Sequence, residues 1–118
     1  MMLLKIVRKF DCAHKLPLHK GQCSNLHGHT YKIVFLVEGK ISADGMIKDF
    51  GELKKFLDQN LPDHQYLNDL MEHPTSENLA EYLSDKFSKL LKEKMALKLK
   101  GLELWESDTC AVIKGDIS

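Results

Sequence analysis

The sequence has no excess of charge of either sign. Lysine and arginine together number 17, as do aspartate and glutamate, so the formal net charge at pH 7 is zero. A chain without net positive charge has no overall field that attracts nucleic acid or an anionic membrane surface. We therefore expect neither nucleic acid nor a membrane among its partners.

Long apolar runs are also missing. The apolar start at residues 1–4 meets Lys5 at once, and no segment approaches the ~7–15 residues of a signal-peptide core or the ~20 residues of a membrane span. We expect a cytoplasmic protein.

The three cysteines are an odd number, which argues against a disulfide framework in a reducing compartment and leaves room for a reactive thiol.

Internal repeats, linkers and low-complexity segments are absent as well. At 118 residues, with 43% hydrophobic and 29% charged residues, the composition is that of an ordinary globular protein. The length is enough for one core with little to spare. We expect a single domain over residues 1–118.

A histidine pair lies at the start of a predicted strand. Residues 30–37 are rich in β-branched and aromatic side chains, with apolar residues at every second position from Tyr31 to Val37. Side chains two apart on a strand point the same way, so His27 and His29 project to one face. Gly28 between them leaves room for the backbone to bend or for close approach.

A third histidine comes from an earlier strand. Residues 4–14 alternate in the same way, and their apolar parity includes His14. If this strand pairs antiparallel with the next, His14 lies beside the start of the second strand, on the face that carries His29. Three imidazole nitrogens with an open fourth position are the pattern of a catalytic zinc site, whereas structural sites are closed by four ligands.

The rest of the chain predicts two helices and then two strands. Asp49 and Glu52 form a capping-box-like start for a helix that ends before Pro62. Thr75 is the expected N-cap of a second helix, with Glu77 in its first turn. The end of that helix is ambiguous over residues 95–99, and we favour a stop by Gly101. Strands are expected at 102–106 and 110–113, giving an α+β fold of order ββααββ with both helices on one sheet face.

Cys23 has three interpretations. It is a fourth ligand closing the zinc site, a proton-transfer or nucleophilic thiol beside a catalytic zinc, or a small buried apolar residue, which is the commonest state of a free cysteine. Its position in a loop close to His27 disfavours the last. Cys12 and Cys110 lie within apolar alternation, and for both we expect burial.

Two further groups are candidates for polar chemistry. Asp63-His64 is either a turn or a carboxylate–imidazole pair that assists proton transfer. Glu106 shares its parity with Leu102 and Leu104, so we expect a partly buried carboxylate. Such a group suits a ligand that offers a fork of N–H donors.

These pieces together resemble the 6-pyruvoyl-tetrahydropterin synthase / 6-carboxy-tetrahydropterin synthase family over almost the whole chain. The matching motifs are Phe10-Asp11-Cys12-Ala13-His14, Cys23 with His27-Gly28-His29 and Tyr31, Asp49-Phe50, Asp63-His64, Leu67-Asn68, Pro74-Thr75-Ser76-Glu77-Asn78 and Trp105-Glu106. Three residues separate Cys23 from His27, a spacing similar to that of the bacterial and archaeal 6-carboxy enzymes.

The resemblance implies a fold, an assembly and a set of roles. The fold is the tunnelling fold, a four-stranded antiparallel sheet with two helices, assembled into a barrel-like hexamer of two trimers with active sites between subunits. The implied roles are zinc binding by His14, His27 and His29, proton transfer by Cys23 with Asp63 and His64, and substrate binding by Glu106, Thr75 and Glu77.

The implied reaction is zinc-dependent. It converts 7,8-dihydroneopterin triphosphate to 6-carboxy-5,6,7,8-tetrahydropterin with release of acetaldehyde and triphosphate, an early step toward 7-deazapurines such as queuosine. Two alternatives stay open. One is the 6-pyruvoyl reaction, which eliminates triphosphate without carbon–carbon cleavage. The other is a non-catalytic, zinc-stabilised binding module in which Cys23 is the fourth ligand.

Overall fold

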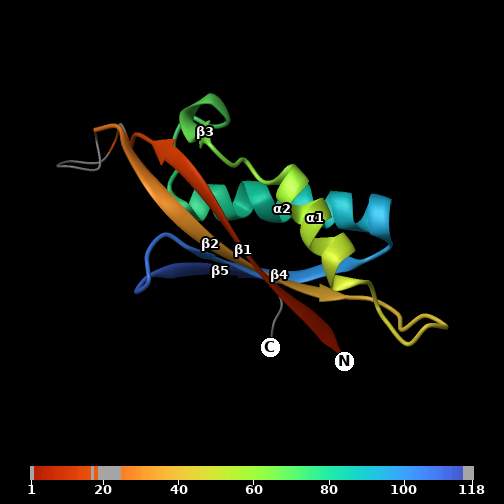
Figure 1. The fold of residues 1–118 in the computed structure, drawn as a ribbon. Helices are drawn as coiled ribbons and strands as arrows, with labels where there is room; N and C mark the ends of the chain where they lie inside the picture. Colours follow the sequence, from red (N-terminus) through yellow and green to blue (C-terminus); the bar gives the residue numbers. More distant parts are fainter. Residues whose placement is uncertain (1, 17, 19–24, 116–118) are drawn as a thin grey trace.

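The computed structural model describes residues 2–16, 18 and 25–115 of the chain. Two helices lie side by side on one face of a sheet that is built around two long, curved strands (Figure 1). The elements are β1 (Leu3–His14), β2 (His27–Glu38), α1 (Phe50–Asn60), β3 (Gln65–Tyr66), a short 3-10 turn η2 (Leu67–Asp69), α2 (Ser76–Met95), β4 (Lys98–Trp105) and β5 (Ala111–Gly115).

The sheet has five strands in the order β3-β1-β2-β4-β5. The pairs β1–β2, β2–β4 and β4–β5 are antiparallel, as predicted. The prediction of a purely antiparallel, four-stranded sheet is wrong, because β3 adds a parallel edge strand in which Gln65 and Tyr66 pair with Cys12 and Ala13. Both residues of β3 are exposed, so they carry no apolar alternation from which a strand could be predicted.

The core lies between the inner sheet face and the helices. The alternating residues of β2 from Tyr31 to Val37 are fully buried, and they pack with Leu53 and Leu57 of α1 and the apolar stripe of α2. Phe35 meets Phe87 of α2 edge to face, with ring centroids 4.9 Å apart. Burial of these side chains holds both helices on the same face of the sheet.

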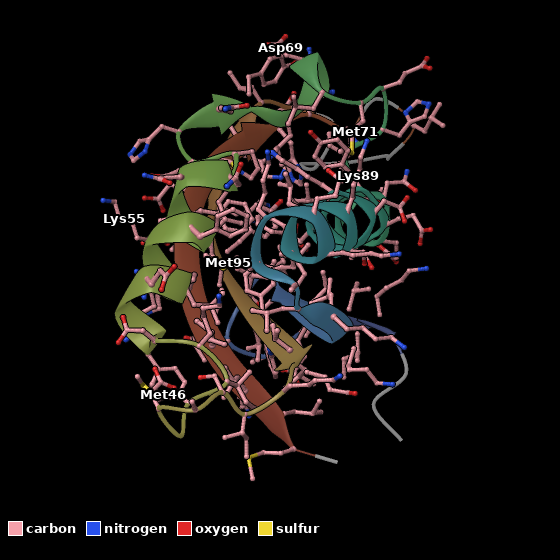
Figure 2. The ribbon with its side chains drawn as sticks, turned by 90° about the vertical axis from the view of Figure 1, so that its right-hand side faces the viewer. Met46, Lys55, Asp69, Met71, Lys89 and Met95 are labelled. Carbon is pink, nitrogen blue, oxygen red and sulfur yellow. The ribbon has the colours of Figure 1, made fainter. Side chains whose placement is uncertain are left out.

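The two helices begin where capping predicts. Asp49 and Thr75 are the N-caps of α1 and α2. The predicted end of α2 near Gly101 is wrong, since the helix ends at Met95 and Ala96 follows in the left-handed conformation. In Figure 2, Lys55 points outward from α1, and Met95, which packs against the core, lies at the end of α2.

Removal of the α1 cap should have a measurable cost. The Asp49 carboxylate accepts a hydrogen bond from the Glu52 backbone N–H at 2.9 Å. We expect Asp49→Ala to lower the free energy of unfolding by about 1 kcal/mol, because this N–H loses its partner. Asp49→Ser is the matched control, since serine keeps a capping oxygen. A urea-unfolding midpoint equal to that of the wild type in the alanine variant would contradict the prediction.

An ion pair fixes α1 against β1. Arg8 donates to both carboxylate oxygens of Asp58, each at 2.8 Å, and the carboxylate raises the pKa of the guanidinium.

In the part of the chain that the structure describes, no helix has the length and apolarity needed to cross a membrane.

Candidate metal centre

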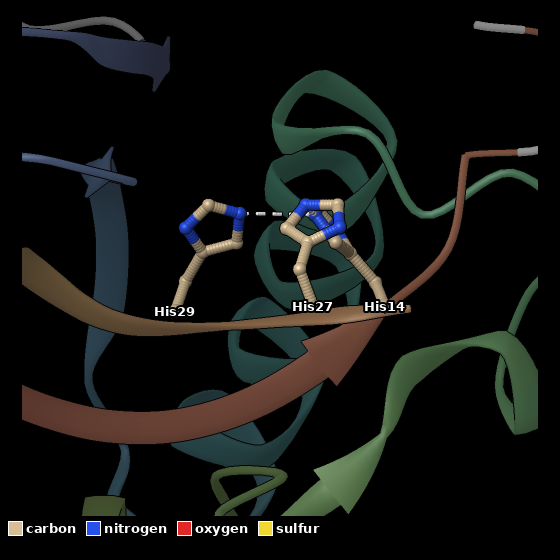
Figure 3. Close-up of side chains that lie close together, drawn as sticks. All are labelled: His14, His27 and His29. Atoms are coloured by element: carbon tan, nitrogen blue, oxygen red, sulfur yellow. Dashed lines mark hydrogen bonds between the residues drawn. The ribbon is translucent and has the colours of Figure 1, made fainter. Parts of the chain in front are cut away.

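The strand register brings the three predicted histidines together. His14 pairs with His27 across β1 and β2, and Cys12 pairs with His29, so all three imidazoles rise from the inner face at the same end of the sheet (Figure 3). The Nε2 atom of His14 lies 2.8 Å from Nε2 of His27 and 3.1 Å from Nε2 of His29. These three side chains form a group that could hold a metal ion.

Two backbone carbonyls fix the tautomers of this cluster. His14 Nδ1 lies 2.8 Å from the Pro74 carbonyl oxygen, and His27 Nδ1 lies 2.7 Å from that of Asn25. A carbonyl only accepts, so each Nδ1 carries the proton and donates it. In the neutral rings the lone pairs of both Nε2 atoms therefore face each other, which is unfavourable unless a cation lies between them.

The donor set fits a zinc ion. Zinc–histidine bonds of ~2.0–2.1 Å in tetrahedral geometry place two ligand nitrogens about 3.3 Å apart. The separations of 2.8 and 3.1 Å reach this value with a small outward movement of the rings. Hydrogen bonds from Nδ1 to carbonyl oxygens are the usual outer partners of metal-binding histidines, because they fix the ring orientation.

Burial favours the neutral form of His14 and His29. The His14 side chain is only 1% exposed, and burial lowers the pKa of His14 despite the opposing effect of its hydrogen bond to Pro74. Burial also lowers the pKa of His29, against the opposing influence of Glu106. A neutral imidazole is the form that binds a metal.

The metal-free protein should lose stability in acid. The folded-state pKa values of His14 and His29 lie below the ordinary 6.5, so the unfolded chain binds more protons as the pH falls through that value. The contribution of the two neutral imidazoles to the free energy of unfolding is therefore complete above about pH 6.5 and decreases below it. We expect a lower urea midpoint at about pH 5.5 than at about pH 7.5 in the presence of a chelator.

The variant His29→Asn tests the source of this dependence. It removes one of the two groups and should flatten part of the profile. A wild-type midpoint that does not change across this pH range would contradict the prediction.

Glu106 lies at the mouth of the histidine cluster. Its Oε1 atom is 3.0 Å from His29 Nε2 and 3.8 Å from His14 Nε2. The side chain is 35% exposed, in agreement with the partial burial expected from its parity. It also lines a cavity of about 460 Å³ with Thr75 and Glu77, so the structure brings the three predicted substrate-binding residues to one place.

Asp63 and His64 lie elsewhere, at the outer edge of β1. The His64 backbone N–H donates to the Asp11 carbonyl at 2.6 Å, and Asp63 Oδ1 accepts from the Asp11 N–H at 2.8 Å. This N–H bond lowers the pKa of Asp63. Asp63 Oδ2 lies 2.9 Å from His64 Nδ1. The pair forms a group with Asp11 that is separate from the histidine cluster.

The pair is open to solvent. The His64 side chain is 77% exposed, and His64 lines a cavity of about 560 Å³ with Gln65 and Tyr66. Asp63 and His64 are therefore outside the three-histidine group, although His29 also lines this cavity.

The two cysteines that the structure describes differ in their surroundings. Cys23 lies outside the described residues. Cys12 is buried as expected, and its thiol donates to the Pro62 carbonyl; burial raises its pKa to about 11. The expectation of burial for Cys110 is wrong, since this residue precedes β5 and is exposed.

Sequence reasoning did not predict two groups that contact His14 on the side of its Nδ1 atom. The Tyr31 hydroxyl lies 3.4 Å from His14 Nδ1, and burial raises the pKa of Tyr31. Its parity with His29 was an available signal. The Pro74 carbonyl had none, because a main-chain contact 60 positions away in sequence leaves no mark on side-chain pattern.

The fold and the cluster together define an α+β protein with a histidine-rich candidate metal site beside a carboxylate-lined cavity. Residues 4–115 match the family described as 6-pyruvoyl tetrahydropterin synthase, and the chain belongs to that family. Members of this family are enzymes of pterin metabolism.

Curated relatives and a solved structure agree with this assignment. A dihydroneopterin monophosphate aldolase of Pyrococcus furiosus is 39% identical over 87% of this chain and 88% of its own length. A 6-carboxy-5,6,7,8-tetrahydropterin synthase of Synechocystis is 39% identical over 86% of this chain and 84% of its own. The structure of Caenorhabditis elegans 6-pyruvoyl tetrahydropterin synthase aligns with a TM-score of 0.80 and 25% identity, covering 97% of this chain and 94% of that one.

Proposed function

We propose that this protein is a zinc-dependent 6-carboxytetrahydropterin synthase. The substrates are 7,8-dihydroneopterin triphosphate and one water molecule, and the products are 6-carboxy-5,6,7,8-tetrahydropterin, acetaldehyde and triphosphate. The observation that carries the proposal is the convergence of three histidine Nε2 atoms beside the cavity that Glu106, Thr75 and Glu77 line. The product would serve the synthesis of 7-deazapurines such as queuosine.

Each end of the substrate has a partner in this arrangement. His14, His27 and His29 would hold zinc, which supplies Lewis-acid polarisation to side-chain hydroxyls and so acidifies the adjacent C–H. Glu106 would accept the 2-amino and ring N–H groups of the pterin as a fork of hydrogen bonds. Thr75 and Glu77, which line the same cavity, would orient the bound ring.

Proton transfer would use a thiol and an imidazole. Cys23 would remove the acidified proton, as its spacing of three residues from His27 resembles that of the 6-carboxy enzymes. His64, paired with Asp63 at 2.9 Å, would exchange protons with the reacting groups. An Asp–His pair of this kind holds the imidazole in one tautomer and stabilises its protonated form.

The position of His64 supports an oligomeric active site. Asp63 and His64 lie in a group separate from the histidine cluster of the same chain, and we propose that a second copy supplies them to the reaction. We propose a homohexamer built as a dimer of trimers, in line with the resemblance. Light scattering should therefore give a mass well above that of one chain.

Mixed oligomers test whether two chains share a site. His27→Ala and His64→Ala should each be inactive alone. Oligomers re-formed from equal amounts of both should regain activity at roughly a quarter of the sites, because each half of a shared site is intact with a probability of about one half. Verified mixed oligomers without any recovery would contradict a shared site.

A second candidate is a dihydroneopterin monophosphate aldolase. The relative of that name in Pyrococcus furiosus is 39% identical over nearly the full length of both chains. The two candidates differ in their substrates, because one acts on a triphosphate ester and the other on a monophosphate ester.

A product assay decides among the candidate functions. Zinc-loaded protein is incubated with the triphosphate and the monophosphate of dihydroneopterin in parallel. Acetaldehyde with 6-carboxytetrahydropterin from the triphosphate supports the proposal. Loss of triphosphate without acetaldehyde supports the 6-pyruvoyl reaction, and turnover of the monophosphate alone supports the aldolase. No turnover of either substrate supports the non-catalytic module.

A further inference from the structure

We propose that Glu106 is a displaceable fourth protein ligand of the metal ion when no substrate is bound. This goes beyond the proposed role of Glu106 in holding the pterin, and it rests on the proposed metal centre of His14, His27 and His29. The substrate-free centre would then have three imidazole nitrogens and one carboxylate oxygen.

Two of the three distances from Glu106 to the imidazoles are close to those between donors in one coordination shell. Zinc–nitrogen bonds of ~2.0–2.1 Å and zinc–oxygen bonds of ~2.0–2.2 Å at tetrahedral angles place nitrogen and oxygen about 3.3–3.5 Å apart. Glu106 Oε1 lies 3.0 Å from His29 Nε2 and 3.8 Å from His14 Nε2, on either side of that value. It is not within 4.8 Å of all three imidazoles, so the carboxylate approaches from the side of His14 and His29.

Glu106 has the freedom to complete the shell and to leave it. The side chain is 35% exposed and borders the 460 Å³ cavity, so rotation about its side-chain bonds meets open space. Among the described residues, its recorded ion-pair partners are the imidazoles of His14 and His29. The structure therefore shows no competing cation that holds this carboxylate away from the cluster in the described part of the chain.

Charge favours the same arrangement. Three neutral imidazoles leave the full double charge of the ion in a largely buried place, and a charge in such a place is stabilised by an opposite charge close by. A carboxylate ligand reduces the net charge of the centre to about one. The pterin ring offers a fork of N–H donors. When it binds, the Glu106 carboxylate would leave the metal ion and accept these N–H groups instead, which would open a coordination position for a substrate oxygen.

The first experiment titrates metal-free protein with Co²⁺ alone and records visible absorption, and measures Zn²⁺ affinity by competition with a chelator. Neither measurement uses a pterin. Glu106→Gln should change the Co²⁺ spectrum and weaken Zn²⁺ binding by at least ~10–100-fold, the loss seen when supporting residues of metal sites are removed. The matched control is Glu103→Gln on β4, the strand that ends at Trp105 just before Glu106. The Glu103 carboxylate accepts from the Trp105 indole N–H at 2.9 Å, and metal binding by this variant should equal that of the wild type.

The outcomes separate this inference from the proposed function. Wild-type spectrum and affinity in Glu106→Gln would overturn the fourth-ligand role and leave the product assay as the test of the function. Absence of Co²⁺ and Zn²⁺ binding by the wild type would overturn both. If the displacement is correct, 7,8-dihydropterin, which has no side-chain hydroxyls, should change the spectrum of the Co²⁺-loaded wild type on binding; bound dihydropterin with an unchanged spectrum would overturn it.

Discussion

His27→Ala is expected to lose its bound zinc and its catalytic activity together. His27 Nε2 lies 2.8 Å from His14 Nε2, and its removal leaves two imidazoles with only the displaceable Glu106 carboxylate beside them, too few fixed ligands to hold the ion tightly. Zinc content after gel filtration should fall from near one per chain to near zero, with turnover below detection. The measurements are metal analysis and the product assay.

His64→Ala is the matched control for this loss. It removes an imidazole of the same size from a group separate from the cluster, so it should keep its zinc even though its turnover falls. Stoichiometric zinc in the His27→Ala variant would remove His27 from the metal site.

Cys23→Ala is expected to keep zinc near one per chain and to lose most turnover. General acid–base groups typically contribute ~10²–10⁴-fold, so the deficit should fall in that range. Pterin binding should survive, because in the proposed site Glu106 and the metal centre would still contact the two ends of the substrate. Zinc content, pterin affinity and turnover are measured on the same preparation.

The three measurements distinguish the interpretations of Cys23. Loss of zinc in the alanine variant would make the thiol a ligand and favour the closed structural site. Full zinc with full turnover would leave Cys23 without a role in either process. Cys23→Ser, which keeps a hydroxyl of similar size, should resemble the alanine variant if a thiolate is required.

Alternation of side chains was enough to predict the long strands and the meeting of the histidines. The period of two assigns Tyr31 and His29 to the same face, and the pairing of His14 with His27 follows from an antiparallel register with both apolar faces turned inward. Capping likewise predicts the starts of both helices, because Asp49 and Thr75 act locally on N–H groups three residues away.

Features that depend on contacts distant in sequence were not predictable. β3 consists of two exposed residues held by the edge of β1. The end of α2 was placed too late, because a left-handed Ala96 gives no glycine signal and residues 95–99 fit either a helix or a strand. Exposure of Cys110 depends on where β5 begins, which apolar alternation does not fix.

The residue types of the site could be predicted from the sequence, but the positions of Glu106 and of Asp63-His64 relative to the three histidines could not. Parity placed Glu106 on the inner face, yet its 3.0 Å approach to His29 depends on the β2–β4 register that pairs Lys32 with Trp105, and side-chain alternation alone does not fix that register. The dipeptide Asp63-His64 was recognisable as a pair. Its attachment to the far edge of β1, away from the three histidines, is a tertiary property that local sequence does not encode.

The hydrogen bond from His14 to the Pro74 carbonyl would link metal binding at the proposed site to folding. It joins the last residue of β1 to the residue two positions before α2, 60 positions along the chain. An ion held on the other nitrogen of the same ring therefore binds best when the start of α2 is docked on the sheet. A ligand that prefers the native state adds to its stability, by about 2.7 kcal/mol at one hundred times its dissociation constant. Metal binding would then stabilise the docking of α2 on the sheet, in addition to its proposed role in turnover.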